Sequence, residues 1–236
     1  MRFLILFIAV FLYADVGVYF YTVKMDYEEY LNSSLLDKDS TNLFDLNGIR
    51  VEVLESDYFL SSEFAYGKSI YQGKTWSGKD LRLNQKNVTI FSLRSGYFLN
   101  KTLYILGGYR RWNRGKSDYE GDYDEVYYWP YIGVGKFFKI NRFSAFFEYQ
   151  YGINPKLKVF LGSGAVLKLG SVNGLLGELR YKFLFRGMVL EIFYRCWMWS
   201  VDKSNASEIT LKNSSYNIYE PSSLTINQYF GIGIRY

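Results

Sequence analysis

The 236-residue chain contains no histidine, one cysteine and only three prolines. Without histidine it lacks the commonest general base of enzymes and the commonest metal ligand of proteins. A single cysteine excludes an internal disulfide and any cysteine-based zinc site. The net charge of +5 is mild, and because the Lys and Arg residues are spread along the chain, no nucleic-acid-binding surface is indicated. Nothing in the composition points to a cofactor.

The N-terminus carries a hydrophobic leader. Arg2 precedes an uninterrupted apolar run at residues 3–13, which ends before a small residue. This is the pattern of a secretory signal peptide cleaved before Asp15. An uncleaved anchor helix is the alternative, but spanning a bilayer takes about 20 apolar residues and this run is shorter. We therefore predict a signal peptide at residues 1–14 and a single domain at residues 15–236.

The rest of the chain is a series of segments in which apolar and polar residues alternate with period 2, the pattern of half-buried β-strands. Ten candidate strands are indicated, at residues 16–27, 47–55, 58–72, 88–99, 102–112, 126–138, 143–153, 172–185, 188–201 and 223–236. Their connections alternate between very short and long, as in a membrane barrel with short periplasmic turns and long external loops. The predicted external loops are rich in Ser, Asn, Asp, Lys and Gly and lie at residues 28–46, 73–87, 113–125, 154–171 and 202–222.

Strand length and face composition favour a transmembrane barrel over a soluble sheet. A tilted strand crosses the bilayer in about 9–11 residues. In "GELRYKFLF", Leu179, Tyr181 and Phe183 share one face, whereas Arg180 and Lys182 share the other. A soluble antiparallel sheet can alternate in the same way, but the even strand number, the 20% aromatic content and the leader favour the membrane. We predict an all-β fold: a transmembrane antiparallel up-and-down β-barrel of ten strands, with eight or twelve strands as alternatives.

Tyr and Trp residues cluster near the ends of the predicted strands, at Tyr127, Tyr128, Trp129, Trp197 and Trp199. Membrane barrels carry aromatic girdles at the level of the lipid headgroups. These five side chains are therefore predicted to form such a girdle.

The polar faces of the strands place a mixed set of charges inside the predicted barrel: Arg50, Glu52, Glu63, Arg94, Arg110, Glu148, Glu178, Arg180, Lys182, Glu191, Arg195 and Arg235. Small barrels fill their interiors with side chains, and a confined charge must be paired or hydrated. We therefore predict a salt-bridged, mostly closed lumen; the alternative is a selectivity path or ligand site. Glu178 and Glu191 could in principle act as acid and base, but the nearby Arg180 and Arg195 favour ion pairing.

The segment "KSDYEGDYDE" is a weak candidate for a metal site, through Asp118, Glu120, Asp122 and Asp124. Calcium takes several carboxylate oxygens, but the spacing does not match the EF-hand loop. A solvated external loop is the favoured alternative.

The chain ends in "NQYFGIGIRY", in which Phe230, Ile232, Ile234 and Tyr236 alternate with small or polar residues. This ending resembles the C-terminal signal that the outer-membrane barrel assembly machinery reads. The whole mature chain resembles Gram-negative outer-membrane β-barrels. The resemblance implies a location in the bacterial outer membrane, contact with its lipid and lipopolysaccharide, and assembly by that machinery.

Within that class, the ten strands and the loop pattern are most similar to the omptin fold, as is the stretch "WPYIGVGKFF". Omptins are proteases that need a His paired with an Asp in one external loop and an Asp pair in another. This chain has no His, the segment 73–87 holds a single carboxylate, Asp80, and the segment 154–171 holds none. No omptin catalytic residue can be carried over, so the resemblance is to the scaffold.

These observations predict a monomeric, non-catalytic outer-membrane barrel with a closed lumen and a structural or surface-interaction role. A narrow porin-like channel or carrier for small solutes is the alternative function. A rim-type omptin-like hydrolase is disfavoured because histidine is absent.

Overall fold

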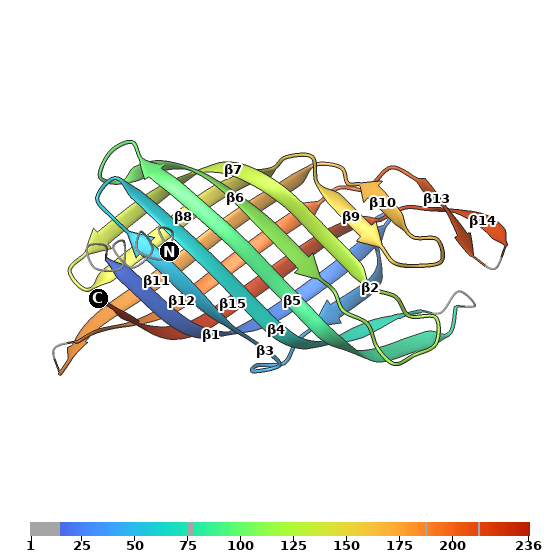
Figure 1. Cartoon of the computed structure of the whole chain (residues 1–236), viewed down its shortest axis with the longest axis horizontal. Coiled ribbons are helices and arrows are strands. Elements are labelled where there is room, and N and C mark those ends of the chain that lie inside the picture. Colours follow the sequence, from blue (N-terminus) through green and yellow to red (C-terminus); the bar gives the residue numbers. More distant parts are fainter. Residues whose placement is uncertain (1–14, 75–77, 187, 212) are drawn as a thin grey trace, which may run out of the picture.

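The computed structural model of the chain describes residues 15–74, 78–186, 188–211 and 213–236, so the predicted signal peptide at 1–14 lies outside the described residues. Ten strands form the wall of a barrel (Figure 1): β1 (Val16–Leu31), β3 (Leu46–Leu54), β4 (Tyr58–Lys74), β5 (Asp80–Phe98), β6 (Leu103–Asn113), β7 (Glu125–Ile140), β8 (Phe143–Gly152), β11 (Val172–Phe185), β12 (Met188–Val201) and β15 (Ser222–Arg235). Across the described residues, no helix is long and apolar enough to cross a membrane.

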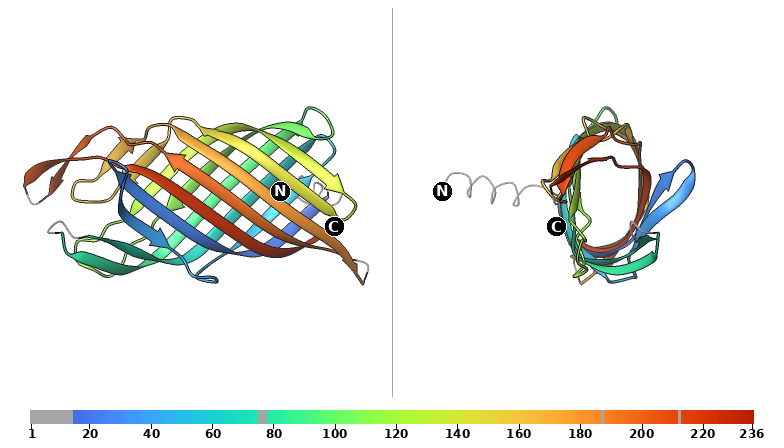
Figure 2. Two further views of the ribbon diagram at one scale, coloured as in Figure 1. Left: turned by 180° about the vertical axis from the view of Figure 1, so that it is seen from behind. Right: turned by 90° about the vertical axis from the view of Figure 1, so that its right-hand side faces the viewer.

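The barrel closes because its first and last strands pair. β1 runs antiparallel to β15 in a register that joins Gly17 to Arg235 and Tyr30 to Ser222. On their other sides β1 pairs with β3 and β15 pairs with β12, so the hydrogen bonds continue around the ring (Figure 2). Ring closure satisfies the backbone groups that an open sheet would expose to lipid. The predicted ten-stranded antiparallel barrel is confirmed.

The barrel has two distinct ends. The short turns and the C-terminus lie at one end, named here the inner end, and the long connections lie at the other, the outer end (Figures 1 and 2).

Segments predicted to be external loops contain further strands. β2 (Ser34–Ser40) lies between β1 and β4, β9 (Lys156–Val159) pairs with β7 and with β10 (Ala165–Lys168), and β13 (Ser207–Leu211) forms a separate hairpin with β14 (Ser214–Ile218). β5 also begins inside a predicted loop, at Asp80. Only Asp39 of β2 is buried, and the other residues of β2 and all of β14 are exposed or half-buried, so the alternation that marks a half-buried strand is weak there.

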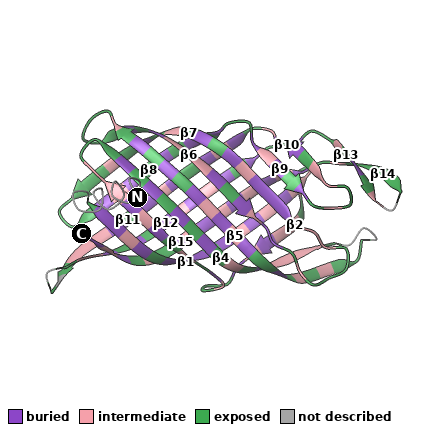
Figure 3. Ribbon diagram, viewed as in Figure 1, coloured by how far each residue is buried: buried purple, intermediate pink, exposed green. Residues whose placement is uncertain are grey.

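Side chains alternate between the interior and the outside along the wall, as the purple and green blocks of Figure 3 show. In β8, for example, Phe147 and Tyr149 are exposed whereas Phe146 and Glu148 are buried. The exposed apolar side chains make an outer belt on the ten strands that includes Phe20, Leu60, Phe64, Leu93, Ile105, Ile132, Phe147, Leu175, Leu179, Ile192 and Ile232. Such a belt is the surface that a membrane barrel presents to lipid.

The predicted aromatic girdle is wrong for four of its five residues. Tyr127, Trp129, Trp197 and Trp199 are at most 3% exposed and lie inside the barrel, while Tyr128 is half-buried. Each buried member has the strand parity of the lumen-facing side chains, so it points inward. The rings of Trp129 and Trp199, from β7 and β12, lie with their centroids 5.2 Å apart, so aromatic side chains fill the middle of the lumen.

Glycines allow β1 and β15 to pack closely around Tyr19. A Cβ atom at Gly233 would lie 2.4 Å from the carbonyl oxygen of Val18 and 2.3 Å from the ring of Tyr19. A Cβ at Gly17 would lie 2.6 Å from the Tyr19 hydroxyl. Only a residue without a side chain fits at these two positions, which accounts for Gly17 on β1 and Gly233 on β15.

Candidate functional site in the barrel lumen

Most of the predicted lumen charges are buried inside the barrel. Eleven of the twelve are at most 4% exposed: Arg50, Glu52, Glu63, Arg94, Arg110, Glu148, Glu178, Arg180, Glu191, Arg195 and Arg235. The twelfth, Lys182, lies nearer the inner end with its side chain 27% exposed, and its Nζ is 2.8 Å from Glu191 Oε1.

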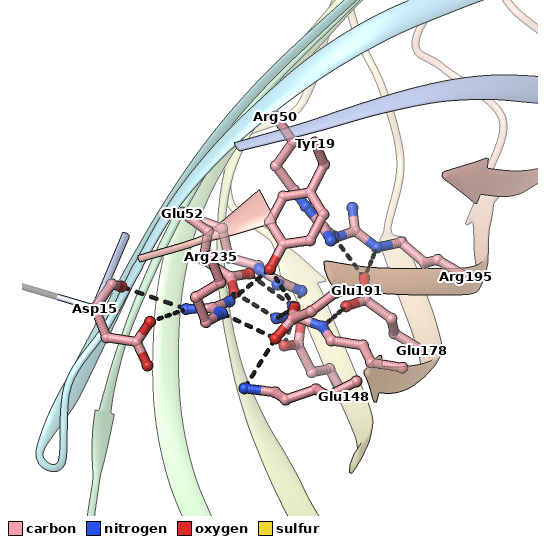
Figure 4. A network of polar contacts seen from close by, with 12 residues as sticks. Asp15, Tyr19, Arg50, Glu52, Glu148, Glu178, Glu191, Arg195 and Arg235 are labelled. Atoms are coloured by element: carbon pink, nitrogen blue, oxygen red, sulfur yellow. Dashed lines mark hydrogen bonds and ion pairs between the residues drawn. The ribbon is translucent and has the colours of Figure 1, made fainter. Parts of the chain in front are cut away.

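Glu178 holds three guanidinium groups from three strands (Figure 4). Arg50 Nη1 donates to Glu178 Oε2 at 2.7 Å, and Arg195 Nε donates to the same oxygen at 2.5 Å. Arg180 Nε donates to the other carboxylate oxygen. Arg195 Nη1 also donates to Glu63 at 2.6 Å, so this cluster ties β4 and β12 together across the lumen.

A second group of contacts crosses the seam between β1 and β15. Arg180 Nη2 donates to Glu52 Oε2 at 2.7 Å, and Arg235 Nη2 donates to Glu52 Oε1 at 2.5 Å. Arg235 Nε donates to Glu191 at 3.0 Å, while the Tyr19 hydroxyl donates to the other oxygen of Glu191 at 2.5 Å. Charge-assisted contacts of this kind are among the stronger hydrogen bonds in proteins, and here they reinforce the closure of the barrel.

Glu148 on β8 connects the charged network to the aromatic middle of the lumen. It accepts hydrogen bonds from Arg94 Nη1 at 3.0 Å, from the Tyr104 hydroxyl at 2.8 Å and from Gln150 Nε2 at 2.6 Å. The Gln150 side-chain oxygen in turn accepts from Trp197 Nε1 at 3.1 Å. The polar groups are therefore joined continuously from Arg94 to the indole of Trp197.

This geometry is suited to cross-linking the wall. A general base must reach a proton of its substrate, but Glu178 and Glu191 direct their oxygens to guanidinium, ammonium and tyrosine donors inside a filled lumen. An ion pair buried in this way is strongly destabilised when one partner is lost, because the other charge is left uncompensated.

A further cluster, which the sequence did not predict, lies around Arg114 at the outer end. Arg114 Nη1 donates to Glu29 at 3.0 Å and to Glu125 at 2.7 Å, and its Nε donates to Asp39. Arg114 and Asp39 fall in segments predicted to be loops, where no lumen was expected. The available signal was strand parity, since the inward face of β1 continues from Tyr27 to Glu29.

Glu220 lies beside this cluster, in the connection that precedes β15. It is buried, and it accepts hydrogen bonds from the hydroxyls of Tyr127 at 2.5 Å and Tyr27 at 2.9 Å. No Lys or Arg of the described residues forms an ion pair with it. Burial, together with the nearby carboxylate of Glu125, raises the pKa of Glu220 to about 8, so this carboxyl is mostly protonated at neutral pH.

Two of the four acidic candidates for a metal site are engaged in other contacts. Asp118 pairs with Lys86, and the Asp122 carboxylate accepts two backbone N–H groups of its own loop at 2.6 and 3.0 Å. Glu120 is exposed and Asp124 is half-buried. Within the described part of the chain, no three or more Asp, Glu, His or Cys residues are arranged to hold a metal ion.

The C-terminal residues singled out by their alternation lie on the outside of β15 and just beyond it. Phe230, Ile232 and Tyr236 are exposed and Ile234 is half-buried. Their side chains therefore belong to the surface that faces lipid.

A closed ten-stranded antiparallel barrel with an apolar outer belt and a filled, charged lumen defines a class of protein, the outer-membrane β-barrels. Among solved structures, the chain is similar to the outer membrane protease OmpT from Escherichia coli, with 12% identity, coverage of 94% of this chain and 95% of that one, and a TM-score of 0.55. It is also similar to Neisserial surface protein A (12% identity, 94% and 97% coverage, TM-score 0.46). A third similar structure is the translocator domain of the autotransporter NalP from Neisseria meningitidis (10% identity, 94% and 88% coverage, TM-score 0.44).

No family model matches the chain, and no curated protein matches its sequence. At 12% identity the similarity to OmpT establishes the fold alone. The predicted class, an outer-membrane β-barrel protein with an omptin-like fold, is confirmed at that level, and a location in the bacterial outer membrane follows from the class.

Proposed function

We propose that this protein is a non-catalytic, closed-lumen barrel that holds its outer hairpins at the bacterial surface as a structural or interaction element. The observation that carries the proposal is the set of ion pairs that crosses the lumen, from Arg50 through Glu178 to Arg195 and Glu63. Together with the buried aromatic rings, these side chains occupy the space through which a solute would pass. Barrels of about this size typically pack their interiors in this way.

Planar-bilayer recording of the purified barrel tests the closed lumen. The wild-type chain is expected to give no steady unitary conductance. A variant that removes both members of one central contact, Arg180→Ser with Glu52→Ser, should conduct more, because it opens space without leaving either partner of that pair alone. Steady, reproducible conductance by the wild type would contradict the proposal and support the narrow channel or carrier.

The proposed role at the surface is supported by the strands that lie outside the ring. β13 and β14 form their own two-stranded sheet at the outer end, and the loop before β10 contacts β13 through a hydrogen bond from Ser163 N to Thr210 O at 3.0 Å. Deleting residues 207–218 should therefore reduce adhesion of cells that display the protein, while the folded barrel still shows its heat-modifiable mobility. Equal adhesion by the two forms would count against an interaction role for this hairpin.

The absence of an enzymatic role is part of the same proposal. It is supported by the lack of histidine in the chain and by the engagement of the lumen carboxylates with cationic and tyrosine partners. Assays of peptide and lipid hydrolysis with the purified barrel should show no turnover. Hydrolysis that depends on Glu29 or Glu220, in the outer cluster, would favour a rim-type hydrolase instead.

The apolar belt implies contact with membrane lipid. We infer that lipopolysaccharide is among these lipids, that the protein acts as a monomer, and that the assembly machinery reads Phe230, Ile232, Ile234 and Tyr236. Replacing Tyr236 with Ser should slow assembly in cells without changing the stability of the folded barrel. An unchanged assembly rate would contradict the role of this residue.

A further inference from the structure

Arg110 on β6 is the lumen arginine whose charge the network does not pair. It is 2% exposed and forms no ion pair with a described residue, although every other arginine in the predicted lumen set does. Its guanidinium carbon instead lies 4.6 Å from the ring centroid of Trp197 and 5.9 Å from that of Trp199. Its Nη1 atom is buried without a hydrogen-bond partner.

The charges of the inner network balance without Arg110. Five buried glutamates face five buried arginines: Glu52, Glu63, Glu148, Glu178 and Glu191 against Arg50, Arg94, Arg180, Arg195 and Arg235. Toward the inner end, the positive charge of Lys182 and the negative charge of Asp15 offset each other through their contacts with Glu191 and Arg235. The outer cluster holds more buried carboxyls than arginines, but they contact Arg114 and tyrosine hydroxyls. Within the inner network, Arg110 is therefore the one buried arginine that no carboxylate contacts among the described residues.

The groups around Arg110 are rich in unpartnered donors. The Nε1–H groups of Trp129 and Trp199 are buried without a partner, and so is the side-chain nitrogen of Asn227. The hydroxyl of Tyr131 is also buried without a partner and lies within electrostatic reach of Arg110, whereas the hydroxyl of Tyr229 lies close enough to accept a hydrogen bond from Arg110. Trp129 is the direct cross-strand neighbour of Arg110, and Trp129 and Trp199 are in contact with each other.

Unpartnered acceptors are fewer in the same part of the lumen. Among atoms that can only accept, Glu63 Oε1 and Asn227 Oδ1 lack a partner, and the second oxygen of Glu63 is held by Arg195 at 2.6 Å. Guanidinium and indole N–H groups can donate but cannot accept. A water molecule could accept some of these hydrogen bonds, but it would leave the charge of Arg110 uncompensated. Because burying an unpaired charge costs several kcal/mol, water alone does not satisfy this site.

We propose that the middle of the lumen binds one small monovalent inorganic anion, of the halide class, against Arg110 and the indole N–H groups of Trp129 and Trp199. The anion supplies the counter-charge that Arg110 lacks among its direct contacts, and it accepts hydrogen bonds from donors that the protein leaves open. This inference does not depend on the closed lumen proposed above. Arg110 and the two indole N–H groups would bind an anion whether it stays in the lumen or passes through it.

Crystallography with bromide as the probe tests the site directly on the wild-type barrel. Crystals grown in bromide should show an anomalous peak within hydrogen-bonding distance of the Arg110 guanidinium and of at least one of the two indole nitrogens. The proposal would be overturned if the lumen showed no anomalous signal and the position beside Arg110 held only water.

A solution measurement uses the tryptophans as reporters. Bromide quenches tryptophan fluorescence on contact, so titration of the folded barrel in detergent at constant ionic strength, with gluconate as the replacement anion, should give saturable quenching. In Arg110→Gln the apparent affinity should fall about tenfold or more, since a hydrogen bond to a charged group contributes about 1.5–3 kcal/mol. Arg111→Gln is the matched control, because Arg111 is exposed on the outside of the same strand. Linear quenching in the wild type, or equal quenching in both variants, would refute the site; bilayer conductance leaves it unaffected.

Discussion

Arg50 and Glu178 lie 128 positions apart in the chain, yet Arg50 Nη1 donates to Glu178 Oε2 at 2.7 Å with both side chains buried. The contact joins β3 to β11 through the lumen, so it depends on the barrel being closed. It shows that ion pairs across the lumen tie together strands that are far apart in the chain.

Replacing Glu178 with Gln should lower the free energy of unfolding by about 3–5 kcal/mol, because three guanidinium groups lose their common anion. Urea unfolding in detergent measures the effect. Glu208→Gln is the control, since Glu208 is exposed on β13 outside the ring, and a change there should stay within about 0.5 kcal/mol. Equal effects of the two substitutions would contradict a stabilising role of the network.

Gly233→Ala should destabilise the barrel by about 1–3 kcal/mol, the usual cost of overpacking. The new methyl group would meet the Val18 carbonyl and the Tyr19 ring at the seam between β1 and β15. Gly177→Ala is the matched control, because its Cβ would meet only the Phe147 ring at an ordinary 3.8 Å. Thermal midpoints of the two variants, read from heat-modifiable gel mobility, should differ clearly; similar midpoints would show that the seam can relax.

Stability should fall as the pH rises, because of Glu220. Its pKa is raised from an ordinary 4.5 to about 8 in the folded protein, so the folded state holds the proton more tightly than the unfolded state. The stabilisation is complete below about pH 4.5 and is lost as the pH rises through about 8. Since one pKa unit corresponds to about 1.4 kcal/mol, Glu220→Gln should be more stable than the wild type at pH 9 by a few kcal/mol. Unfolding curves at pH 5, 7 and 9 measure this difference, and parallel pH dependence in both forms would refute it.

A charge on the outer belt should be costly only where lipid touches the wall. Phe147, in the middle of β8, is 53% exposed, and Phe147→Lys should destabilise the barrel in lipid by about 2–4 kcal/mol if it lies near the bilayer midplane. Leu36→Lys is the comparison, because Leu36 is also exposed but belongs to β2. Refolding into vesicles at increasing urea concentration gives both values. A similar small cost at both positions would place β8 away from the bilayer centre.

The positions of ten strands, the inward direction of the twelve charges and the outward face of the C-terminal strand could all be read from period-2 alternation. Arg180 and Phe183 must face opposite sides of any strand that contains both, so a single register assignment settles the whole segment. Closure was also foreseeable, because a strand exposed to lipid cannot leave its backbone groups unpaired.

The tertiary structure decided what alternation cannot encode. The parity that Trp197 and Trp199 share with Glu191 and Arg195 already indicated the lumen, but the packing of Trp197 and Trp199 with each other and with Trp129 is seen only in the closed ring. Arg114 and Glu220 come from segments without a strand pattern, and they are buried against side chains of β1, β2 and β7.

The partners of each charge likewise depend on the tilt and closure of the sheet. These bring Arg50 to Glu178 across the barrel and leave Arg110 beside tryptophan rings. The sequence by itself therefore determined which side of the wall each strand residue occupies, since that follows from the geometry of a single strand. Only the closed barrel determined the contacts that cross the lumen, such as those of Arg50 with Glu178 and of Arg195 with Glu63, because these join strands that are distant in the chain.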